Sequence, residues 1–295
     1  MSITPYFRLI RAPHWIKNAF LFVPLVYSRN LFHWEYLSLT LLGFLAFNLA
    51  SSMVYVLNDV VDRDRDKLHP KKKLRPIPAG EVSPSAAMVV LGLLGVVTVF
   101  LSLKLNVQFQ VIILAYLLLN TAYSFKLKNI VLLDIFSIAG GFILRVWAGT
   151  VVIMVEASSW LILITLFISL FLAVMKRMSE SELLNTEEQD HILVRKVLEN
   201  YSRRFIDQIS AVSAGGVIFF YAFYTMAPRT MEVFGTDDLI YTTPFVVFGI
   251  FRYMYLVYQH NKGESTIEIL MQDVPTIVNA LIYLSTTVLI VYKLI

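Results

Sequence analysis

The sequence contains no cysteine and few charged residues. Without cysteine, disulfide bonds and thiolate metal sites are excluded. Only 16% of the 295 residues are charged, whereas a typical soluble domain has about 25%. In contrast, 57% of the residues are hydrophobic and the mean hydropathy is +0.68. A soluble fold of this length does not need so many apolar residues for one core, so the composition indicates a membrane protein.

Long apolar runs occupy most of the chain. A helix of roughly 20 apolar residues crosses the hydrocarbon core of a bilayer, and no lipid-exposed loop can lie within it. The runs therefore predict an all-α, polytopic membrane protein with nine transmembrane helices in a single domain, residues 1–295. Pro24 and the polar stretch SRNLFHWE interrupt the first two spans. The predicted spans are 17–37, 38–57, 84–103, 107–125, 131–152, 157–176, 208–228, 240–259 and 275–294.

Positive charge is distributed unequally between alternate loops. In a soluble chain, a net charge of +4 and a pI near 9.1 would suggest binding to nucleic acid. Here 19 of the lysines and arginines fall on one side of the predicted membrane and 4 on the other. Because cytosolic loops carry the excess of these residues, we expect a cytosolic N-terminus and cytosolic loops at 58–83 and 176–207. The charge thus indicates a multi-pass protein of the plasma (inner) membrane and no nucleic-acid partner.

The loop at 58–83 begins with the pattern N-D-x-x-D-x-x-x-D. If the preceding helix continues past the membrane, Asn58, Asp59, Asp62 and Asp66 lie on one of its faces, and Asp64 points away. Carboxylate and amide oxygens suit Mg²⁺, which takes one or two carboxylates together with substrate phosphate oxygens. The pattern predicts a magnesium site, with a solvated helix end as the alternative.

Cations follow the acidic residues directly. Arg75 stands before two prolines in a stiff segment and is predicted to contact a phosphate. Lys71–Lys73 are better explained as a topology signal. Lys126 and Lys128 end a span on the same side and are candidate phosphate contacts, with the topology signal again as the alternative.

The second cytosolic loop also begins directly after a span. Glu180 lies one helical turn beyond Lys176 and Arg177, so it could join a metal site or orient a cation. Tyr201, near the end of this loop, either closes a pocket or anchors an interfacial helix.

Charged residues within spans are costly and therefore informative. Arg145 lies on a glycine-rich segment, where it either grips a phosphate or pairs with a buried carboxylate; Asp134 lies three turns before it. Arg252 either pairs with another side chain or extends to the interface. Lys17 and Asn18 lie near the N-terminus at the cytosolic face.

Together these residues predict a site for Mg²⁺ and a diphosphate at the cytosolic mouth of a helical bundle. The matching chemistry is departure of pyrophosphate, in which the metal stabilises the leaving oxygens. The apolar surroundings imply that at least one substrate is a lipid.

The pattern at Asn58–Asp66 on a nine-span bundle resembles the UbiA-type intramembrane prenyltransferase superfamily. Members of this superfamily hold Mg²⁺ and a diphosphate between this motif and a second D-x-x-x-D motif in the later cytosolic loop. Residues 176–207 contain KRMSESEL and a distant Asp190 but no D-x-x-x-D. The segments RAPHWIKN, YSFKLKNIVLLDIFSIAGGFILRVWAG and FGIFRYMYL are similar to the branch of decaprenyl-phosphate phosphoribosyltransferases.

This resemblance implies a reaction and a set of roles. Phosphoribosyl pyrophosphate (PRPP) would donate its phosphoribosyl group to a polyprenyl phosphate, with Mg²⁺ on the pyrophosphate held by Asn58–Asp66. Glu180 would replace the missing second motif, and the lipid tail would lie between apolar helices. The implied catalytic residues are Asp59, Asp62 and Glu180. The implied substrate contacts are Lys17, Asn18, Arg75, Lys126, Lys128, Arg145, Lys176, Arg177 and Tyr201.

Two other functions compete with this one. A prenyltransferase that moves a polyprenyl group from its diphosphate to an aromatic or quinone-precursor acceptor would share the first motif. A transporter or channel would explain nine spans and a charge within the membrane, but not acids clustered at one mouth.

Overall fold

The computed structural model describes residues 4–68, 72–186, 197, 200–260 and 272–294. Within these ranges the chain forms helices joined by turns and contains no strand, so the all-α prediction is confirmed. The longer helices are α3 (Trp34–Val61), α5 (Pro84–Ser102), α6 (Val107–Phe125), α7 (Leu133–Val152), α8 (Ser159–Thr186), α9 (Arg203–Met226), α11 (Thr243–His260) and α13 (Val274–Val291). The shorter ones are α1 (Thr4–Ile10), η1 (Ala12–Leu21), α2 (Phe22–Tyr27), α4 (Arg63–Leu68), η2 (Lys72–Leu74), η3 (Leu127–Asn129), α10 (Pro228–Phe234) and η6 (Asp238–Thr242).

Eight helices of the described residues are long and apolar enough to cross a membrane. They correspond to eight of the nine predicted spans, and the chain is therefore a multi-pass membrane protein. The span predicted at 17–37 differs, because the chain there forms η1 and α2 and then turns at Ser28–His33. Arg29 adopts a positive φ of 62° in this turn. The extra span was predicted because the segment is apolar, although it does not form one continuous helix.

The helix boundaries follow local capping chemistry. The side chains of Ser83, Asn106 and Ser202 accept hydrogen bonds from the third backbone N–H beyond them, at the starts of α5, α6 and α9. Such caps satisfy backbone donors that have no partner within the helix. In addition, α5 begins with Pro84, whose fixed φ suits the first helical position. The three helices begin at residues 84, 107 and 203, where the predicted spans begin at 84, 107 and 208.

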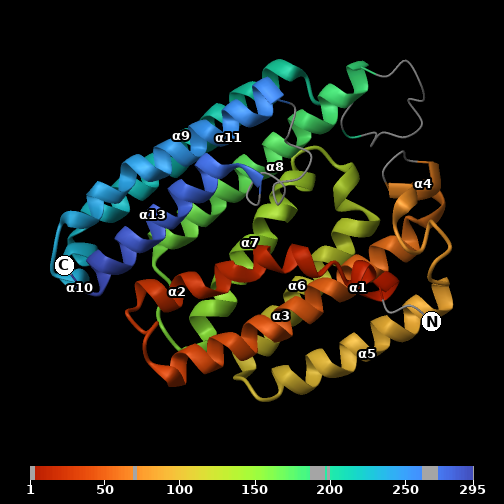
Figure 1. Ribbon diagram of the computed structural model, residues 1–295, viewed down its shortest axis with the longest axis horizontal. Coiled ribbons are helices and arrows are strands. Elements are labelled where there is room, and N and C mark those ends of the chain that lie inside the picture. Colours follow the sequence, from red (N-terminus) through yellow and green to blue (C-terminus); the bar gives the residue numbers. More distant parts are fainter. Residues whose placement is uncertain (1–3, 69–71, 187–196, 198–199, 261–271, 295) are drawn as a thin grey trace. The chain divides into compact units, whose positions relative to one another are not determined.

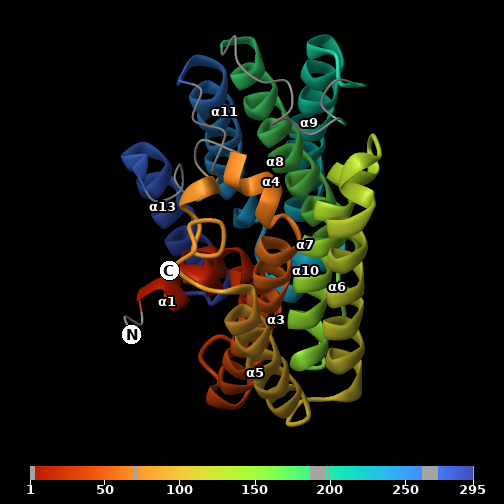
Figure 2. The same cartoon turned by 90° about the vertical axis from the view of Figure 1, so that its right-hand side faces the viewer.

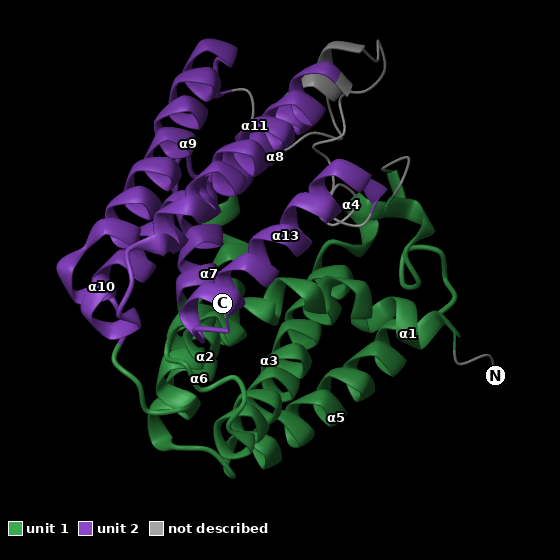
Figure 3. Cartoon of the chain, turned by 60° about the vertical axis from the view of Figure 1, so that its left-hand side comes forward, with its two compact units in different colours: residues 1–128, 144–156, 191–193 green, residues 129–143, 157–190, 194–295 purple. Residues whose placement is uncertain are grey.

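The described residues form two compact units (Figure 3). The first unit comprises residues 1–128 and 144–156, and the second residues 129–143, 157–190 and 194–295, each within its described parts. Helix α7 contributes its first half to the second unit and its last residues to the first. The expectation of one domain over residues 1–295 stays a prediction.

In the first unit, α3 and α5 lie side by side (Figures 1 and 2). One core cluster includes Phe47 of α3 and Tyr116 of α6, whose ring centroids are 4.6 Å apart. Gly149 of α7 meets the backbone of η1 so closely that an added Cβ would lie 2.2 Å from the carbonyl oxygen of Leu21. Glycine is therefore required for this helix to approach η1.

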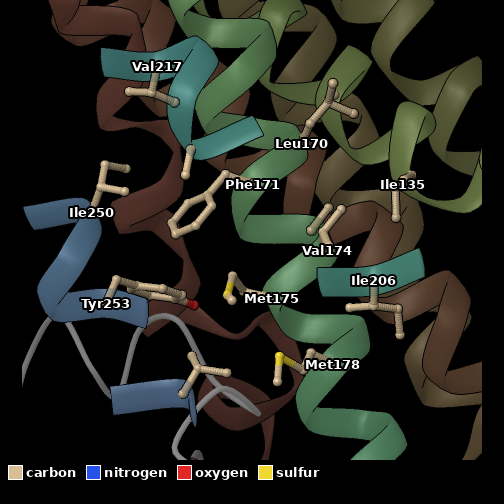
Figure 4. Close-up of a cluster of buried hydrophobic side chains, with 14 of the residues drawn as sticks. Ile135, Leu170, Phe171, Val174, Met175, Met178, Ile206, Val217, Ile250 and Tyr253 are labelled. Carbon is tan, nitrogen blue, oxygen red and sulfur yellow. The ribbon is translucent and has the colours of Figure 1, made fainter. Parts of the chain in front are cut away.

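In the second unit, the core is built largely on α8. Figure 4 shows Phe171, Met175 and Met178 of α8, with Tyr253 of α11 nearby. The rings of Phe171 and Tyr253 meet edge to face at 5.7 Å. Helix α9 packs along α8 at Gly216, where an added Cβ would lie 2.1 Å from the ring of Phe167. Small residues at such crossings let membrane helices approach closely.

Candidate functional site

A polar seam joins η1 to α3 in the first unit. Three side-chain pairs define it: Arg11 with Asp59, Trp15 with Ser52, and Asn18 with Asn48. From one pair to the next, the residue number rises in the first segment and falls in α3, so the two segments run antiparallel. The α3 residues are spaced by four and seven positions and lie on one face of the helix. Helical geometry thus draws the polar side chains of two segments into one row.

The Asp59 end of the seam has unused hydrogen-bond acceptors. The side-chain oxygen of Asn58 and Oδ2 of Asp59 are buried, and neither has a partner among the described residues. Nη1 of Arg75 bridges Asp59 and Asp66, at 3.2 Å from Oδ1 of Asp59. Both carboxylates are nearly fully buried, with exposed fractions of 1% and 4%. Buried anionic oxygens are costly without a cation, so this end of the seam favours one.

The helix ends within the predicted acidic face. The last residue of α3 is Val61, and Asp62 caps it before α4 begins at Arg63. The carboxylate of Asp62 therefore accepts two hydrogen bonds from Nζ of Lys128, each 3.0 Å long, and does not join Asp59 and Asp66 at Arg75. The expectation of one continuous helical face through Asp66 is wrong, because the chain turns at Asp62. Asp64 is exposed and pairs with Lys67, in keeping with its predicted position.

The side-chain oxygens at the Asp59 end of the seam are suitable ligands for a divalent cation. No three acidic or histidine side chains of the described residues lie close enough together to hold a metal by themselves. Mg²⁺, however, takes one or two carboxylates and completes its shell with water and substrate phosphate. The unpartnered oxygens of Asn58 and Asp59 fit that requirement, and Arg75 now supplies the positive charge beside them.

The Asn48 end of the seam has the opposite character. Nε of Arg145 donates to Oδ1 of Asn18 at 2.6 Å, and Nδ2 of Asn18 donates to Oδ1 of Asn48 at 2.7 Å. Nη2 of Arg145 also donates to the hydroxyl of Tyr116 at 2.9 Å. The guanidinium lies over the rings of Phe47 and Tyr116. Arg145 is thus embedded among neutral polar and aromatic groups of the first unit.

Lys17 and Lys126, two of the predicted phosphate contacts, belong to the first unit. Lys17 is partly buried, and burial together with the charges of Arg145 and Arg11 lowers its pKa from 10.5 to about 8. Lys126 caps the end of α6 and is exposed. Arg11 is also partly buried, which lowers the pKa of its guanidinium, and the nearby charge of Arg75 acts in the same direction.

A second charged cluster lies in the second unit. The hydroxyl of Tyr201 donates to Oδ1 of Asp134 at 2.6 Å and accepts from the backbone N–H of Leu132 at 2.8 Å. Nε of Arg177 is 3.4 Å from Oδ2 of Asp134, and both side chains are almost completely buried. Burial and the bond to Asp134 raise the pKa of Tyr201, so its phenol is protonated. This geometry shows Tyr201 anchoring the start of α7, a membrane-spanning helix, which is a role that the sequence did not predict.

Glu180 contacts both of the cations that precede it. Its carboxylate pairs with Arg177 and lies 3.9 Å from Nζ of Lys176. Glu180 is more accessible than Arg177, with 22% of its side chain exposed against 1%. The predicted contact between Glu180 and these cations is therefore present. Asp190, also considered for this loop, lies outside the described residues.

Arg252 has a structural partner within the second unit. Its guanidinium donates two hydrogen bonds to Asp273, of 2.8 and 3.1 Å, and Asp273 also caps the start of α13. The pairing lowers the pKa of Asp273. Of the two roles predicted for Arg252, pairing is the observed one.

Asn48 and Tyr116 were not predicted as members of polar clusters, and Asp134 was considered beside Arg145, whereas it pairs with Arg177 and Tyr201. Both Asn48 and Tyr116 are uncharged and lie within an apolar span, so neither carries the strong signal of a charged residue. A signal existed for Asn48, because Asn48, Ser52, Tyr55 and Asp59 repeat at helical spacing.

The structure thus combines a bundle of membrane-spanning helices with a buried acidic cluster in its first unit. Residues 19–271 match the UbiA prenyltransferase family. The chain belongs to this family and is an enzyme of the transferase class.

Curated relatives cover most of the chain. It is 33% identical to a decaprenyl-phosphate phosphoribosyltransferase of Mycobacterium tuberculosis over 221 residues, covering 74% of this chain and 72% of the relative. It is 32% identical to the protein of that name from Mycolicibacterium smegmatis over 224 residues, or 75% and 70% of the two chains. The protein of that name from Corynebacterium glutamicum is 29% identical over 297 residues, or 97% and 86%.

Solved structures share the fold at low sequence identity. A UbiA homologue from Archaeoglobus fulgidus bound to GPP and Mg²⁺ superposes with a TM-score of 0.71 and 16% identity, covering 98% of this chain and 99% of the other. A UbiA homologue from Archaeoglobus fulgidus bound to DMAPP and Mg²⁺ superposes with a TM-score of 0.70 and 16% identity, covering 97% of this chain and 99% of the other. These similarities establish the fold of the chain.

Proposed function

We propose that this protein transfers the 5-phosphoribosyl group of PRPP to a polyprenyl phosphate and releases pyrophosphate. The observation that carries the proposal is the similarity to decaprenyl-phosphate phosphoribosyltransferases over about three quarters of the chain or more. The acceptor-rich end of the seam supports it independently, because a pyrophosphate leaving group needs a cation and this end favours one.

In the proposed reaction, a phosphate oxygen of the lipid attacks C1 of the ribose. A C1–O bond to the lipid forms as the C1–O bond to pyrophosphate breaks, and that electron pair leaves with the pyrophosphate. The transition state has oxocarbenium character, and no oxidant or reductant is needed. Mg²⁺, when bound, would supply positive charge to the leaving oxygens. Asn58 and Asp59 would hold it, with Asp62 and Asp66 as further ligands.

The side chains of the first unit have defined tasks in this proposal. Arg75 would move from Asp59 and Asp66 to the pyrophosphate once the metal neutralises these carboxylates. Lys128 would bind phosphate while Asp62 turns to the metal. Lys17, Asn18 and Arg145 would contact a further phosphate, and Lys126 the substrate from the exposed end of α6.

The second unit adds a further set of predicted contacts. Glu180 would act as a catalytic carboxylate, and Lys176 as a phosphate contact, since both are partly exposed. Arg177 and Tyr201 are committed to Asp134, so we propose that they act by fixing the segment that carries Glu180.

The proposal includes a location. The partners are PRPP, a polyprenyl phosphate and the bilayer, and no nucleic acid is involved. The loops at 58–83 and 176–207 and the N-terminus would face the cytosol of the plasma (inner) membrane, where a charged donor such as PRPP is available.

The test uses the purified protein in nanodiscs with Mg²⁺, labelled PRPP and decaprenyl phosphate. Labelled lipid is the expected product. Asp59→Asn should lower its rate by at least about 100-fold, because a buried metal ligand loses its charge, whereas Asp64→Asn, the matched change at an exposed carboxylate, should leave the rate within about twofold. Equal rates for the two variants would remove Asp59 from the reaction.

A second candidate function is prenyl transfer to an aromatic or quinone-precursor acceptor. Its supporting observation is the 36% identity to a protohaem IX farnesyltransferase of Leptospira biflexa, which covers 96 residues and 30% of this chain. The same assay with a labelled prenyl diphosphate and an aromatic acceptor separates the two. Product from this pair alone would contradict the phosphoribosyl proposal.

A further inference from the structure

A cleft of about 420 Å³ lies on the first unit, where α1 meets η1. Its described lining residues come from both segments, between Thr4 and His14. The chain bends between the segments at Arg11, whose backbone is left-handed with φ 52° and ψ 49°. Pockets for small ligands have volumes of about 300–1,000 Å³, so the cleft is large enough for a small ligand or a head group.

The bend that forms the cleft is fixed to α3. The hydroxyl oxygen of Ser52 lies 2.9 Å from the backbone carbonyl oxygen of Ile10 and accepts a hydrogen bond of 3.0 Å from Nε1 of Trp15. The guanidinium of Arg11 lies over the ring of Tyr55, 5.0 Å from its centroid. Since α3 holds the chain on both sides of the bend, the shape of the cleft is set by the fold.

The walls of the cleft are cationic and apolar. Arg8 and Arg11 line it beside the apolar side chains of Phe7 and Pro13. No acidic side chain and no side-chain amide of the described residues takes part in the lining. Such walls favour an anion that is attached to an apolar group.

Both arginines keep hydrogen-bond donors for a ligand. Arg8 pairs with Glu81 and Arg11 with Asp59, and each arginine uses only Nη2 for its pair. A guanidinium has five N–H donors, so each has others that make no hydrogen bond to the described part of the chain. The side chains of Arg8 and Arg11 are 48% and 18% exposed, and both are therefore accessible.

The pair between Arg11 and Asp59 places the cleft at the end of a membrane span. Asp59 lies in the last turn of α3, which is long and apolar enough to cross the bilayer. The polar head groups of lipids lie just outside the hydrocarbon core, at this level. Phe7 is 61% exposed and adds apolar surface beside the two arginines, as aromatic residues do at membrane interfaces. The position thus favours a lipid over a soluble anion.

We propose that the cleft between α1 and η1 binds the phosphate monoester head group of an isoprenoid lipid, with Arg8 and Arg11 as the phosphate contacts. Two guanidinium groups match the two charges of a monoester, whereas the phosphodiester of a common phospholipid has one. PRPP fits less well, because its ribose hydroxyls need acceptors and the described walls offer neither a carboxylate nor an amide.

The role of this lipid rests on the proposed function, in which it is the acceptor. Arg11 lines the cleft and also pairs with Asp59, the carboxylate proposed to hold the metal. The acceptor phosphate would therefore bind beside the pyrophosphate site. Arg8 and Arg11 become acceptor-binding residues, and neither is among the contacts that the resemblance implies.

The experiment measures binding without turnover, in EDTA and without PRPP. Labelled farnesyl phosphate is bound to the purified protein in phosphatidylcholine nanodiscs, with empty discs as the background. Unlabelled farnesyl phosphate, farnesol, ribose 5-phosphate and inorganic phosphate then compete. We expect farnesyl phosphate to compete at concentrations at least about tenfold lower than the other three. Phosphatidylglycerol in the discs should change the affinity by less than about twofold, because its phosphodiester carries one charge.

Two variants break the same ion pair and should act in opposite directions. Arg8→Gln removes a phosphate contact and should weaken binding by at least about fivefold, whereas Glu81→Gln removes the competing carboxylate and should tighten binding by about twofold. Because the pair is exposed, both variants should retain the fold. Arg229→Gln is the matched control at an exposed arginine of the second unit and should bind as the parent does.

The signs of these changes decide the outcome. Weaker binding in both variants would assign Arg8 a structural role through Glu81, and unchanged binding in Arg8→Gln would remove it from the site; either result overturns the proposal. Equal competition by farnesol, ribose 5-phosphate or inorganic phosphate, or displacement by phosphatidylglycerol, also overturns it. A protein that passes these tests but transfers no phosphoribosyl group retains the lipid site and loses the proposed function.

Discussion

Replacing Tyr201 with phenylalanine separates its observed anchoring of α7 from the substrate contact that the resemblance implies. The change removes one oxygen atom, and the ring retains its stacking against Phe205, with a centroid distance of 6.1 Å. The lost oxygen makes two hydrogen bonds, one to the carboxylate of Asp134 and one from the backbone N–H of Leu132. Since Tyr201 is 5% exposed, water does not readily replace either bond.

The expected loss of stability follows from these two bonds. A hydrogen bond to a charged group contributes about 1.5–3 kcal/mol, and an unsatisfied buried N–H costs about 1–3 kcal/mol. Because such effects add incompletely, we expect a loss of about 3 kcal/mol. A change of 1 kcal/mol shifts the melting temperature of a domain of 150–250 residues by about 2–4 °C. The variant should therefore melt about 6–12 °C below the parent.

Thermal unfolding of the protein in nanodiscs, followed by tryptophan fluorescence, measures this shift. Tyr241→Phe is the control, since Tyr241 is 69% exposed and its melting temperature should stay within about 1 °C of the parent. A Tyr201→Phe variant with an unchanged melting temperature and a raised KM for PRPP would refute the anchoring role. Tyr201 would then contact the substrate.

Three further predictions concern packing, charge and topology. Gly216→Ala should destabilise the protein by more than about 1 kcal/mol because its Cβ meets the ring of Phe167, whereas Gly215→Ala, with no atom within 4 Å of its Cβ, should be neutral or stabilising; a thermal melt of both variants compares them. Lys17 has a folded-state pKa of about 8, below its ordinary 10.5, so the unfolded state binds more protons in this range and stability should rise as the pH increases from about 8 to 10.5. Melts of the parent and Lys17→Met across this range should show the rise in the parent alone, and a parallel course for both would contradict it. Because the chain has no cysteine, single-cysteine variants report topology directly: an impermeant maleimide should label Lys104→Cys in intact spheroplasts but Asp64→Cys only after lysis, and the reverse pattern would invert the proposed orientation.

Most of the fold could be predicted from the sequence because membrane spans have a strong compositional signal. The span predicted at 107–125 coincides with α6, since Asn106 and the apolar run define both ends. The region 17–37 was predicted as a span because composition does not reveal where a helix breaks. There, Arg29 in a left-handed conformation and the turn before α3 interrupt the segment.

The candidate site was less predictable than the fold. Asn58 and Asp59 could be placed because their spacing and their position at the end of a span are local properties. The partner of Asp62 could not, since Lys128 is 66 residues away and the turn at Asp62 determines the contact. The contacts of Asn48 and Tyr116 could not be predicted either, because their partners Asn18 and Arg145 lie 30 and 29 residues away in the sequence.

The seam between η1 and α3 also imposes an order on biogenesis. Arg11, Trp15 and Asn18 emerge from the ribosome 48, 37 and 30 residues before Asp59, Ser52 and Asn48. During that interval their polar groups lack their final partners, and a bilayer interior would leave them unsatisfied. The η1 segment is therefore expected to wait at the aqueous surface while the translocon inserts α3, and to dock against it afterwards.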